Sequence, residues 1–315
     1  MARIGLVLGA GGPVGHAYHA GVLAALAESG WDPRSAEVMV GTSAGSIVAA
    51  FLRAGLSAGD LAASSLRRPL SPLGAELMQR SGRRSRLATP GPQHADLARG
   101  PAAAQLLLKP WGVRLGALAA ALLPAGKVST EAISAGVQAI YGTAWPKAAT
   151  YVCALRLDDG RLVAFGSPGA PPATMAEAVA ASCAIPAYFR PVVIGGTRHV
   201  DGGSHSVTNA DLLAGLGLDL VIVSCPMGGT RDALAIGIDL PMRGAIRFRL
   251  AAEVAAVRRS GTPVLTLQPT RVTRDAMGGN PMDARRGPAV TEAAHETTRK
   301  RLADSDVRER LAALA

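Results

Sequence analysis

The chain has 315 residues, of which 49% are hydrophobic and 18% charged, enough apolar material for one large core or two small ones. No stretch reaches the roughly 18 apolar residues that a membrane-spanning helix needs, so we expect no transmembrane anchor. The net charge of +10 fits nucleic acid, an anionic membrane surface or acidic substrates without choosing among them. Because the arginine clusters lack interleaved aromatic residues, nucleic acid is disfavoured as a partner. The oligomeric state stays unknown.

The first 56 residues alternate between strand-like and helix-like patterns. Apolar runs at 3–8 and 37–40 predict strands, and periodic apolar positions at 17–29 and 44–54 predict helices. This order is typical of a parallel sheet covered by helices. Since a glycine run follows the first apolar run without a small-residue cleavage site, we expect the N-terminus to be a strand rather than a signal peptide.

Between residues 57 and 128 the pattern loosens into stretches rich in Pro, Gly and Arg, with Ala/Leu segments at 101–108 and 113–123. No strand is evident there, which predicts a helical insertion or cap with long loops. The leucines between 106 and 123 fit two interpretations equally well: an acyl pocket or membrane contact, or a packed core with a charged rim.

Strand-like runs return at 150–157 and 161–165, and the Asp-Asp-Gly between them predicts a hairpin turn. Thr174 and Glu177 have the spacing of a capping box and predict a helix through Ser182. Further strands are expected at 191–194, 218–224 and 264–268, and further helices near 209–216, 243–259 and 287–312. With no internal repeat and no linker, we expect a single domain over 1–315, whose C-terminal part is helical from about 270.

The three cysteines, Cys153, Cys183 and Cys225, lie far apart in apolar strings without metal-ligand spacing. We expect them to be buried and reduced, which indicates the cytoplasm. The sequence suggests no metal site.

A nucleophile candidate follows the second predicted strand. The sequence Gly41-Thr-Ser43-Ala-Gly45 stands where that strand turns into a helix, which is the context that a GxSxG motif requires. Gly41 and Gly45 remove side chains where strand and helix backbones pass closely. Ser43 then lies at a helix N-terminus, where free N–H groups stabilise developing negative charge. The alternative is a serine that only caps the helix.

A glycine-rich loop, residues 9–15, follows the first strand. As a phosphate cradle it nearly matches GxGxxG, but the third glycine position is Val14 and no acidic residue follows at the expected spacing. As an oxyanion hole it supplies the backbone N–H groups of Gly11 and Gly12 beside Ser43. We favour the oxyanion hole, because the neighbouring nucleophile gives these amides a role.

A serine nucleophile also needs a base. None of the six histidines has a context that marks it as a triad member, and His205 lies only four residues after Asp201. The order and spacing therefore disfavour an ordinary triad hydrolase. Asp201-Gly-Gly follows a short apolar run, and in isolation it is an unremarkable turn.

Taken together, these segments resemble the patatin-like phospholipases. The resemblance is carried by the glycine-rich loop leading into AYHAGVLAAL, by GTSAG, by ASCAIPAYFRPV at 181–192 and by DGG at 201–203 followed by Asn209. Their order and spacing fit over about residues 3–225. The resemblance implies a three-layer α/β/α sandwich with a mainly parallel central sheet and a helical insertion.

The resemblance also implies a chemistry. Ser43 would be the nucleophile and Asp201 its base, in a Ser-Asp dyad that works without histidine, metal or cofactor. The Gly11 and Gly12 amides would bind the oxyanion, and an acyl-enzyme would form. The implied function is a serine lipid acyl hydrolase of the phospholipase A or lysophospholipase type, acting on a lipid or acyl ester in the cytoplasm or at an anionic membrane surface. The alternatives are a non-catalytic nucleotide- or lipid-binding α/β protein and a generic soluble carboxylesterase.

The glycine-rich loop departs from the family pattern, which usually carries Gly-Gly-Gly, any residue, Arg or Lys, then Gly. Aligned without gaps from AYHAGVL, the third glycine falls on Pro13, the basic residue on Gly15 and the last glycine on His16. Slipping the register by one restores Gly15 but puts the basic position on Val14. Either way the basic residue is missing, and His16 is a candidate substitute donor.

Overall fold

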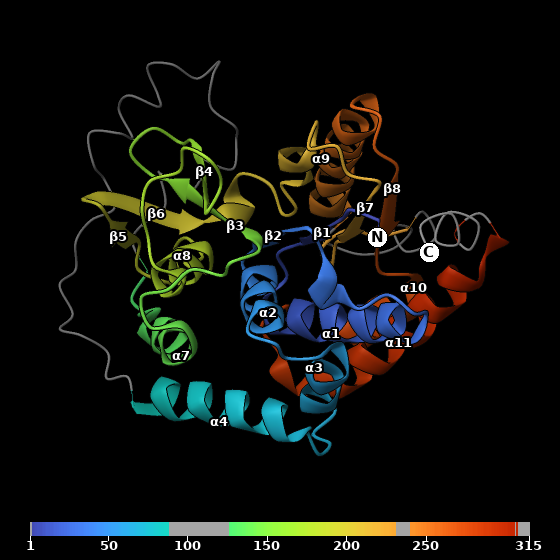
Figure 1. Ribbon diagram of the computed structural model, residues 1–315, viewed down its shortest axis with the longest axis horizontal. Helices are drawn as coiled ribbons and strands as arrows, with labels where there is room; N and C mark the ends of the chain where they lie inside the picture. Colours follow the sequence, from blue (N-terminus) through green and yellow to red (C-terminus); the bar gives the residue numbers. More distant parts are fainter. Residues whose placement is uncertain (1, 88–125, 231–239, 306, 308–315) are drawn as a thin grey trace.

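A computed structural model of the chain describes residues 2–87, 126–230, 240–305 and 307. Within these residues one sheet of eight strands forms the centre of the molecule (Figure 1). The strands are β1 (Ile4–Leu8), β2 (Val38–Thr42), β3 (Ala149–Arg156), β4 (Leu162–Phe165), β5 (Val192–Ile194), β6 (Thr197–Asp201), β7 (Leu220–Ser224) and β8 (Val264–Leu267). Their order is β5-β6-β3-β2-β1-β7-β8, with β4 also paired to β3. The neighbouring strands β3, β2, β1, β7 and β8 pair in parallel. The pairs β3–β4, β3–β6 and β5–β6 are antiparallel.

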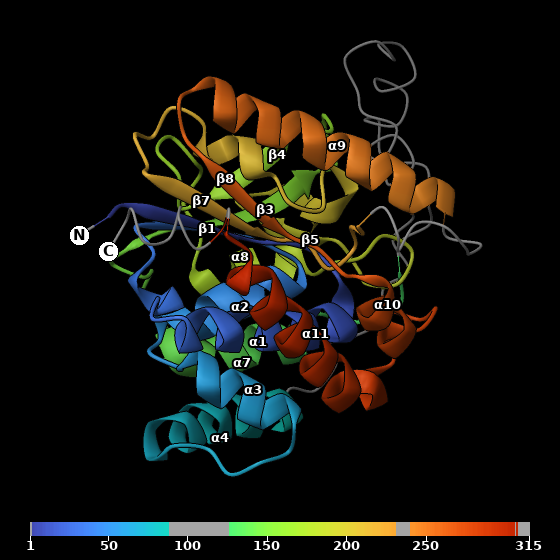
Figure 2. The same cartoon turned by 90° about the vertical axis from the view of Figure 1, so that its right-hand side faces the viewer.

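Helices cover both faces of the sheet (Figure 2). The described helices are α1 (Gly12–Glu28), α2 (Ala44–Arg53), α3 (Ala58–Ser65), α4 (Pro72–Leu87), α7 (Glu131–Tyr141), α8 (Met175–Ser182), α9 (Leu240–Arg259), α10 (Arg271–Met277) and α11 (Gly287–Ala303). In Figure 2, α9 lies above the sheet, and α1, α2 and α11 lie below it. The predicted fold class, a three-layer sandwich with a mainly parallel central sheet, is confirmed.

The strand β1 shows how the sequence pattern makes both layers. Its side chains alternate between the two faces of the sheet. Leu6 and Leu8 join the core between the sheet and helices α1 and α2, whereas Val7 joins the core between the sheet and α9. Every residue of β1 is buried, as expected for a strand in the middle of a parallel sheet that is covered on both faces.

The sheet branches at β3. Along one edge of β3, parallel β2 pairs as far as Thr42 opposite Cys153, and antiparallel β6 continues from Asp201 opposite Ala154. The other edge is taken by β4, which pairs with residues 152–155. Because β2 and β6 occupy successive positions on one edge, the end of β2 meets the end of β6.

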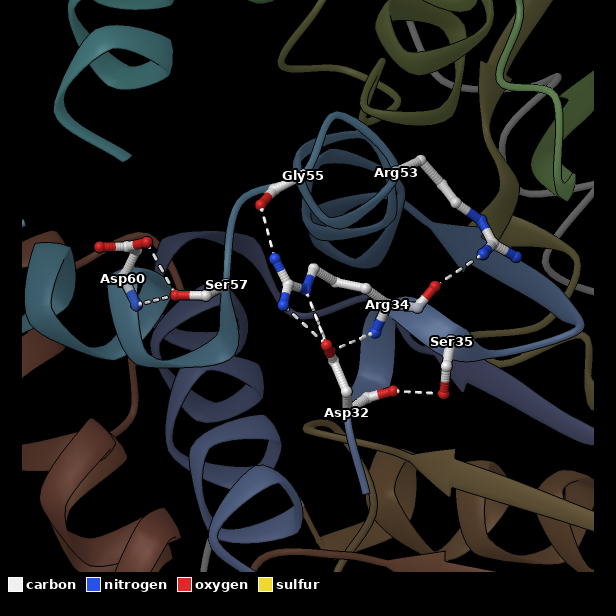
Figure 3. Close-up of polar contacts among 7 residues, drawn as sticks. All are labelled: Asp32, Arg34, Ser35, Arg53, Gly55, Ser57 and Asp60. Carbon is white, nitrogen blue, oxygen red and sulfur yellow. Dashed lines mark hydrogen bonds and ion pairs between the residues drawn. The ribbon is translucent and has the colours of Figure 1, made fainter. Parts of the chain in front are cut away.

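A polar cluster holds the far end of α2 (Figure 3). Arg34 bonds the carboxylate of Asp32 through Nε at 2.9 Å and donates to the Gly55 carbonyl, just past α2, at 3.1 Å. Arg53, in the last turn of α2, donates to the Arg34 carbonyl at 3.1 Å and to Thr150 on β3. A cation at this end also complements the helix dipole. The cluster fixes α2, and hence the turn at its N-terminus, against the sheet.

Most predicted elements are present, with four corrections. The helix predicted from 17 begins at Gly12, because Pro13 is well suited to a first helical turn. The helix predicted near 209–216 is only a 3₁₀ turn, Ala210–Leu213. The last helix is interrupted at Asp304, whose backbone is extended. Residues 131–141 form a helix that we did not predict.

The predicted cap is described only in part. Residues 57–87 hold α3 and α4, whereas the Ala/Leu segments at 101–108 and 113–123 lie outside the described residues. In the described part of the chain, no helix combines the length and apolar character needed to cross a bilayer.

Candidate active site

The turn between β2 and α2 holds Ser43 in a strained backbone conformation. Its φ of 53° and ψ of −121° fall where glycine is normally found, and its side chain is buried. The sequence predicted this strand-turn-helix context. Gly45 is required by close packing, since a Cβ there would collide with the Leu8 carbonyl, and a Cβ on Gly41 would lie 2.6 Å from Ser46 Cα.

Asp201 ends β6 and meets Ser43 through the branch at β3. The Ser43 hydroxyl lies close enough to the Asp201 carboxylate for a hydrogen bond between them to lower the pKa of the carboxyl group. The Gly203 N–H donates to Asp201 Oδ1 at 2.7 Å. Both side chains are 5% exposed. The structure therefore brings the two predicted catalytic candidates together in one cavity, where both are almost out of solvent.

Burial changes the acidity of this carboxyl group. It raises the pKa of Asp201 from 3.8 to about 6, although the hydrogen bonds from Ser43 and Gly203 act in the opposite direction. A carboxylate with a pKa near neutrality holds a proton more strongly than an exposed aspartate does. It is thus better matched to accepting the proton of a serine hydroxyl.

The glycine-rich loop leads from β1 into the first turn of α1. The Gly9 and Ala10 N–H groups donate to the carbonyls of Ser224 and Val207, at 3.0 and 2.8 Å. The N–H groups of Gly11 and Gly12 have no hydrogen-bond partner among the described residues, and Gly12 has a positive φ of 60°. These two amides belong to a helix N-terminus, the kind of site that stabilises an anion.

One cavity of about 360 Å³ joins these features. Ser43, Asp201, Gly11 and Gly12 all line it, together with Gly203 and Ser204. Its remaining described walls are apolar: Ala10, Ile185, Pro186, Tyr188, Val207, Met227, Pro281 and Met282. A polar floor inside apolar walls suits a ligand with one reactive polar group and a hydrocarbon part.

The missing basic residue has no replacement in the cavity. No Lys or Arg is among its described lining residues, and His16 does not line it either. The Val14 N–H is already used by the Pro281 carbonyl at 3.1 Å. Oxyanion binding would therefore depend on backbone amides and the helix N-terminus, and His16 is discarded as a substitute donor.

Three of the described histidines make hydrogen bonds away from Ser43. His19 is buried between Ser224 Oγ and the Gly9 carbonyl, each at 2.8 Å, and burial lowers its pKa to about 3. His205 bonds Asn209 Oδ1 at 2.9 Å, and His295 bonds Glu28 at 2.8 Å. None of the described histidines has a hydrogen bond to Ser43. His19 thus supports the glycine-rich loop from behind as a neutral side chain.

Three supporting residues were missed in the sequence or received no role from it. Ser182 Oγ accepts a hydrogen bond from the Ser43 N–H at 2.8 Å. Asn209 donates to Thr42 Oγ1 at 3.1 Å. Glu253 on α9 accepts from Thr208 Oγ1 at 2.6 Å and from the Ala210 N–H at 3.0 Å. They hold the residues that flank Ser43 and the loop that follows Asp201.

The apolar walls contributed by Met227, Pro281 and Met282 were also missed, since they lie beyond the matched motifs and carry no chemical signal. The predicted burial of the three cysteines is confirmed, and burial raises the pKa of all three thiols. In the described part of the chain, no group of three or more His, Cys, Asp or Glu side chains could hold a metal ion.

Residues 6–214 match the family model described as "Patatin-like phospholipase". Because this match covers more than half of the 315 residues, the chain belongs to the patatin-like phospholipase family. Membership supports lipid ester hydrolysis as its class of activity. Among curated proteins, none matches the sequence significantly.

Solved structures similar to this chain include VipD from Legionella pneumophila, with 14% identity over 99% of this chain and 67% of that one, at a TM-score of 0.44. The type III effector ExoU has 18% identity over 96% and 54%, at a TM-score of 0.35. The ExoU–SpcU complex of Pseudomonas aeruginosa has 18% identity over 100% and 57%, at a TM-score of 0.36. The chain thus spans between about half and two thirds of the length of these chains.

Proposed function

We propose that the protein is a serine lipid acyl hydrolase of the phospholipase A or lysophospholipase type. The observation that carries the proposal is that Ser43 and Asp201 line one largely apolar cavity together with the Gly11 and Gly12 amides, which have no hydrogen-bond partner among the described residues. Nucleophile, base and oxyanion donors are then all present within one site. Family membership supports the same class of reaction.

The mechanism begins with proton transfer from Ser43 Oγ to the Asp201 carboxylate as Oγ attacks the ester carbonyl carbon. The carbonyl oxygen becomes an oxyanion, which the Gly11 and Gly12 N–H groups stabilise. When the tetrahedral intermediate collapses, the alcohol leaves with the proton held by Asp201, and the acyl group stays on Ser43.

Water completes the cycle. Asp201 accepts a proton from the water molecule that attacks the acyl-enzyme, and the second tetrahedral intermediate releases a carboxylic acid as Ser43 Oγ regains its proton. The apolar walls around Ile185, Met227 and Met282 would hold the acyl chain during both steps. No step requires a metal ion or an organic cofactor.

A contact with the lipid surface accompanies this function. Tyr188 and Met282 line the cavity and are nevertheless 48% and 37% exposed, so they place apolar surface at its mouth. The arginines Arg80, Arg83, Arg84 and Arg86 are a second candidate for contact with an anionic membrane, and they belong to α4. There Arg80 is paired with Glu76 and bonds the Ala139 carbonyl, while the side chains of residues 83–87 lie outside the described part. The mouth is therefore the better-supported contact surface.

Two alternatives remain distinguishable. A nucleotide-binding protein is disfavoured because the described lining of the cavity holds no basic side chain. A generic carboxylesterase would act on short soluble esters and gain nothing from long-chain lipids. A lipid hydrolase should instead prefer long-chain phospholipid or lysophospholipid in mixed micelles.

The deciding experiment is labelling with a fluorescent fluorophosphonate, followed by hydrolysis assays. Wild type should label rapidly and hydrolyse long-chain phospholipid, whereas Ser43→Ala should do neither and Asp201→Asn should lose hydrolysis. His205→Gln is the matched control and should keep its rate within about tenfold, far from the loss expected for a true triad member. Labelling of Ser43→Ala at the wild-type rate would reject the proposal.

A further inference from the structure

A second cavity lies between α9 and the edge strand β8, on the face of the sheet that α9 covers. Its volume is about 540 Å³, and its described lining shares no residue with the cavity at Ser43. It is lined by Arg247, Leu250, Ala251, Val254, Ala255, Arg258, Arg259, Thr266 and Gln268. We call it the α9 groove.

The α9 groove has an apolar middle and basic ends. Its residues on α9 recur at three- and four-residue spacing, so they form one stripe along the helix. Arg247 stands at one end, and Arg258 and Arg259 stand at the other, about 16 Å away at 1.5 Å per residue. Between them the stripe carries only leucine, valine and alanine.

Among the described residues, no acidic side chain neutralises the positive charge of the groove. No carboxylate is among its described lining residues, and within the described chain Arg247 and Arg259 have no ion-pair partner. In the described part of the chain, Arg258 donates to the Val264 carbonyl, at 3.1 Å, and forms no ion pair. Arg249, also on α9, behaves differently, because it is paired with Glu253 at 3.0 Å. Guanidinium groups that have no carboxylate partner and lie next to an apolar surface favour an anionic ligand with a hydrocarbon part.

We propose that the α9 groove binds a free long-chain fatty carboxylate. The carboxylate would lie between Arg258 and Arg259, and the hydrocarbon chain would cover Ala251 and Val254 toward Arg247. Burial of the chain supplies affinity in proportion to its apolar area, and the arginines fix its direction.

An extended peptide fits the groove less well. The carbonyls of Pro263, just before β8, and of Leu267 accept hydrogen bonds from the Val221 and Cys225 N–H groups, on the side of β7. The Val264 carbonyl therefore lies on the open edge, where an added strand would pair. Arg258 already donates to that carbonyl. A peptide strand would have to displace this contact, whereas a carboxylate can accept from the remaining N–H groups of the same guanidinium.

The test uses a fluorophore that reports on the groove alone. Ala252→Cys, on the exposed surface of α9 beside the groove, is labelled with acrylodan in the full chain, where the native cysteines are buried. Dodecanoate should shift the emission with saturable binding. Ala251→Trp, which fills the groove from an exposed position, and the double variant Arg258→Gln, Arg259→Gln should each weaken binding at least about tenfold.

The matched control is the double variant Arg67→Gln, Arg271→Gln, which removes the same charge from two exposed arginines outside the groove and should leave dodecanoate binding within about twofold. Circular dichroism confirms that each variant is folded, and the arginine pair keeps the test decisive if Ala251→Trp does not fold. The proposal is overturned by dodecanol binding as tightly as dodecanoate, by butyrate or phosphate competing equally, by an acidic peptide binding more tightly, or by no saturable shift.

Discussion

The hydroxyl oxygen of Ser182 accepts a 2.8 Å hydrogen bond from the backbone N–H of Ser43, which joins the end of α8 to the turn that carries the proposed nucleophile. Both residues are buried, so no water can replace this acceptor without rearrangement. The backbone of Ser43 is strained, and a strained conformation persists only where its surroundings hold it.

Ser182→Ala should therefore lower both stability and activity. Leaving the Ser43 N–H buried without a partner should cost about 1–3 kcal/mol of unfolding free energy, and the mispositioned hydroxyl should lower kcat more than it changes KM. Urea unfolding and ester hydrolysis measure the two effects. Ser65→Ala removes a partly buried hydroxyl paired with Thr291 and should leave kcat unchanged. Equal kcat values for the two variants would contradict a positioning role for Ser182.

Hydrolysis should depend on the ionisation of Asp201. Because burial raises the pKa of Asp201 to about 6, the carboxylate needed as a base is lost as the pH falls through that value. Below it, kcat/KM should decrease about tenfold for each pH unit. A rate profile between pH 4 and 9 checks this. A midpoint near the ordinary aspartate pKa would show that the loss of activity at low pH is not caused by protonation of Asp201.

Asp201→Asn should make the protein inactive but more stable at neutral pH. The folded-state pKa of Asp201 lies above its unfolded value, so the unfolded chain ionises first as the pH rises, and folding loses stability between the two values. A shift from 3.8 to about 6 corresponds to at most about 3 kcal/mol. The asparagine variant should gain about 1–3 kcal/mol near pH 8, and the gain should vanish near pH 4. If the gain in unfolding free energy is the same at pH 4 and pH 8, it does not come from the ionisation of Asp201.

Ser43→Gly should be more stable than Ser43→Ala. At a φ of 53° and a ψ of −121° a side chain is strained, whereas glycine adopts this conformation freely. Removing the strain should outweigh the extra entropy of glycine in the unfolded chain and leave a difference of about 1 kcal/mol. Thermal unfolding of the two inactive variants is the measurement. If alanine is equal or better, the turn is not strained in solution.

Glu253→Ala should be among the most damaging changes outside the cavity. It removes one of the two carboxylate partners of Arg249, the other being Asp211, and leaves Thr208 Oγ1 and the Ala210 N–H without their acceptor, so we expect a loss of about 3–5 kcal/mol. Glu253→Gln keeps an oxygen acceptor and should lose less. Glu296→Gln, which removes an exposed carboxylate paired on α11, is the control and should cost under about 1 kcal/mol. Chemical denaturation ranks the three variants.

The sequence was most informative where local chemistry decides the structure. The capping box of Thr174 and Glu177 forms as predicted, because both of its hydrogen bonds are made within one helical turn. The turn at Ser43 was predicted for a similar reason. Glycines on both sides of a serine between a strand and a helix indicate that the two backbones pass closely there.

Contacts between distant segments could not be read in this way. Nothing near Glu253 indicates that its carboxylate will hold residues 208 and 210, because that contact depends on how α9 crosses the sheet. The walls at Met227 and Met282 are ordinary apolar residues until the fold places them beside Ser43. Even the role of Asp201 came from family resemblance, since its contact with Ser43 arises from the pairing of β2 and β6 on a shared edge of β3.

The place of β1 has a consequence for the order in which the chain folds during its synthesis. β1 pairs with β2 on one side, within about the first forty residues, but with β7 on the other, where Ile4 lies opposite Leu220. A ribosome adds about 5–20 residues each second, so this second edge of β1 stays open for roughly ten seconds or longer. An unpaired edge of a buried, wholly apolar strand is prone to association with other chains. The nascent chain is thus most exposed to misassembly in the interval before β7 emerges and pairs with β1.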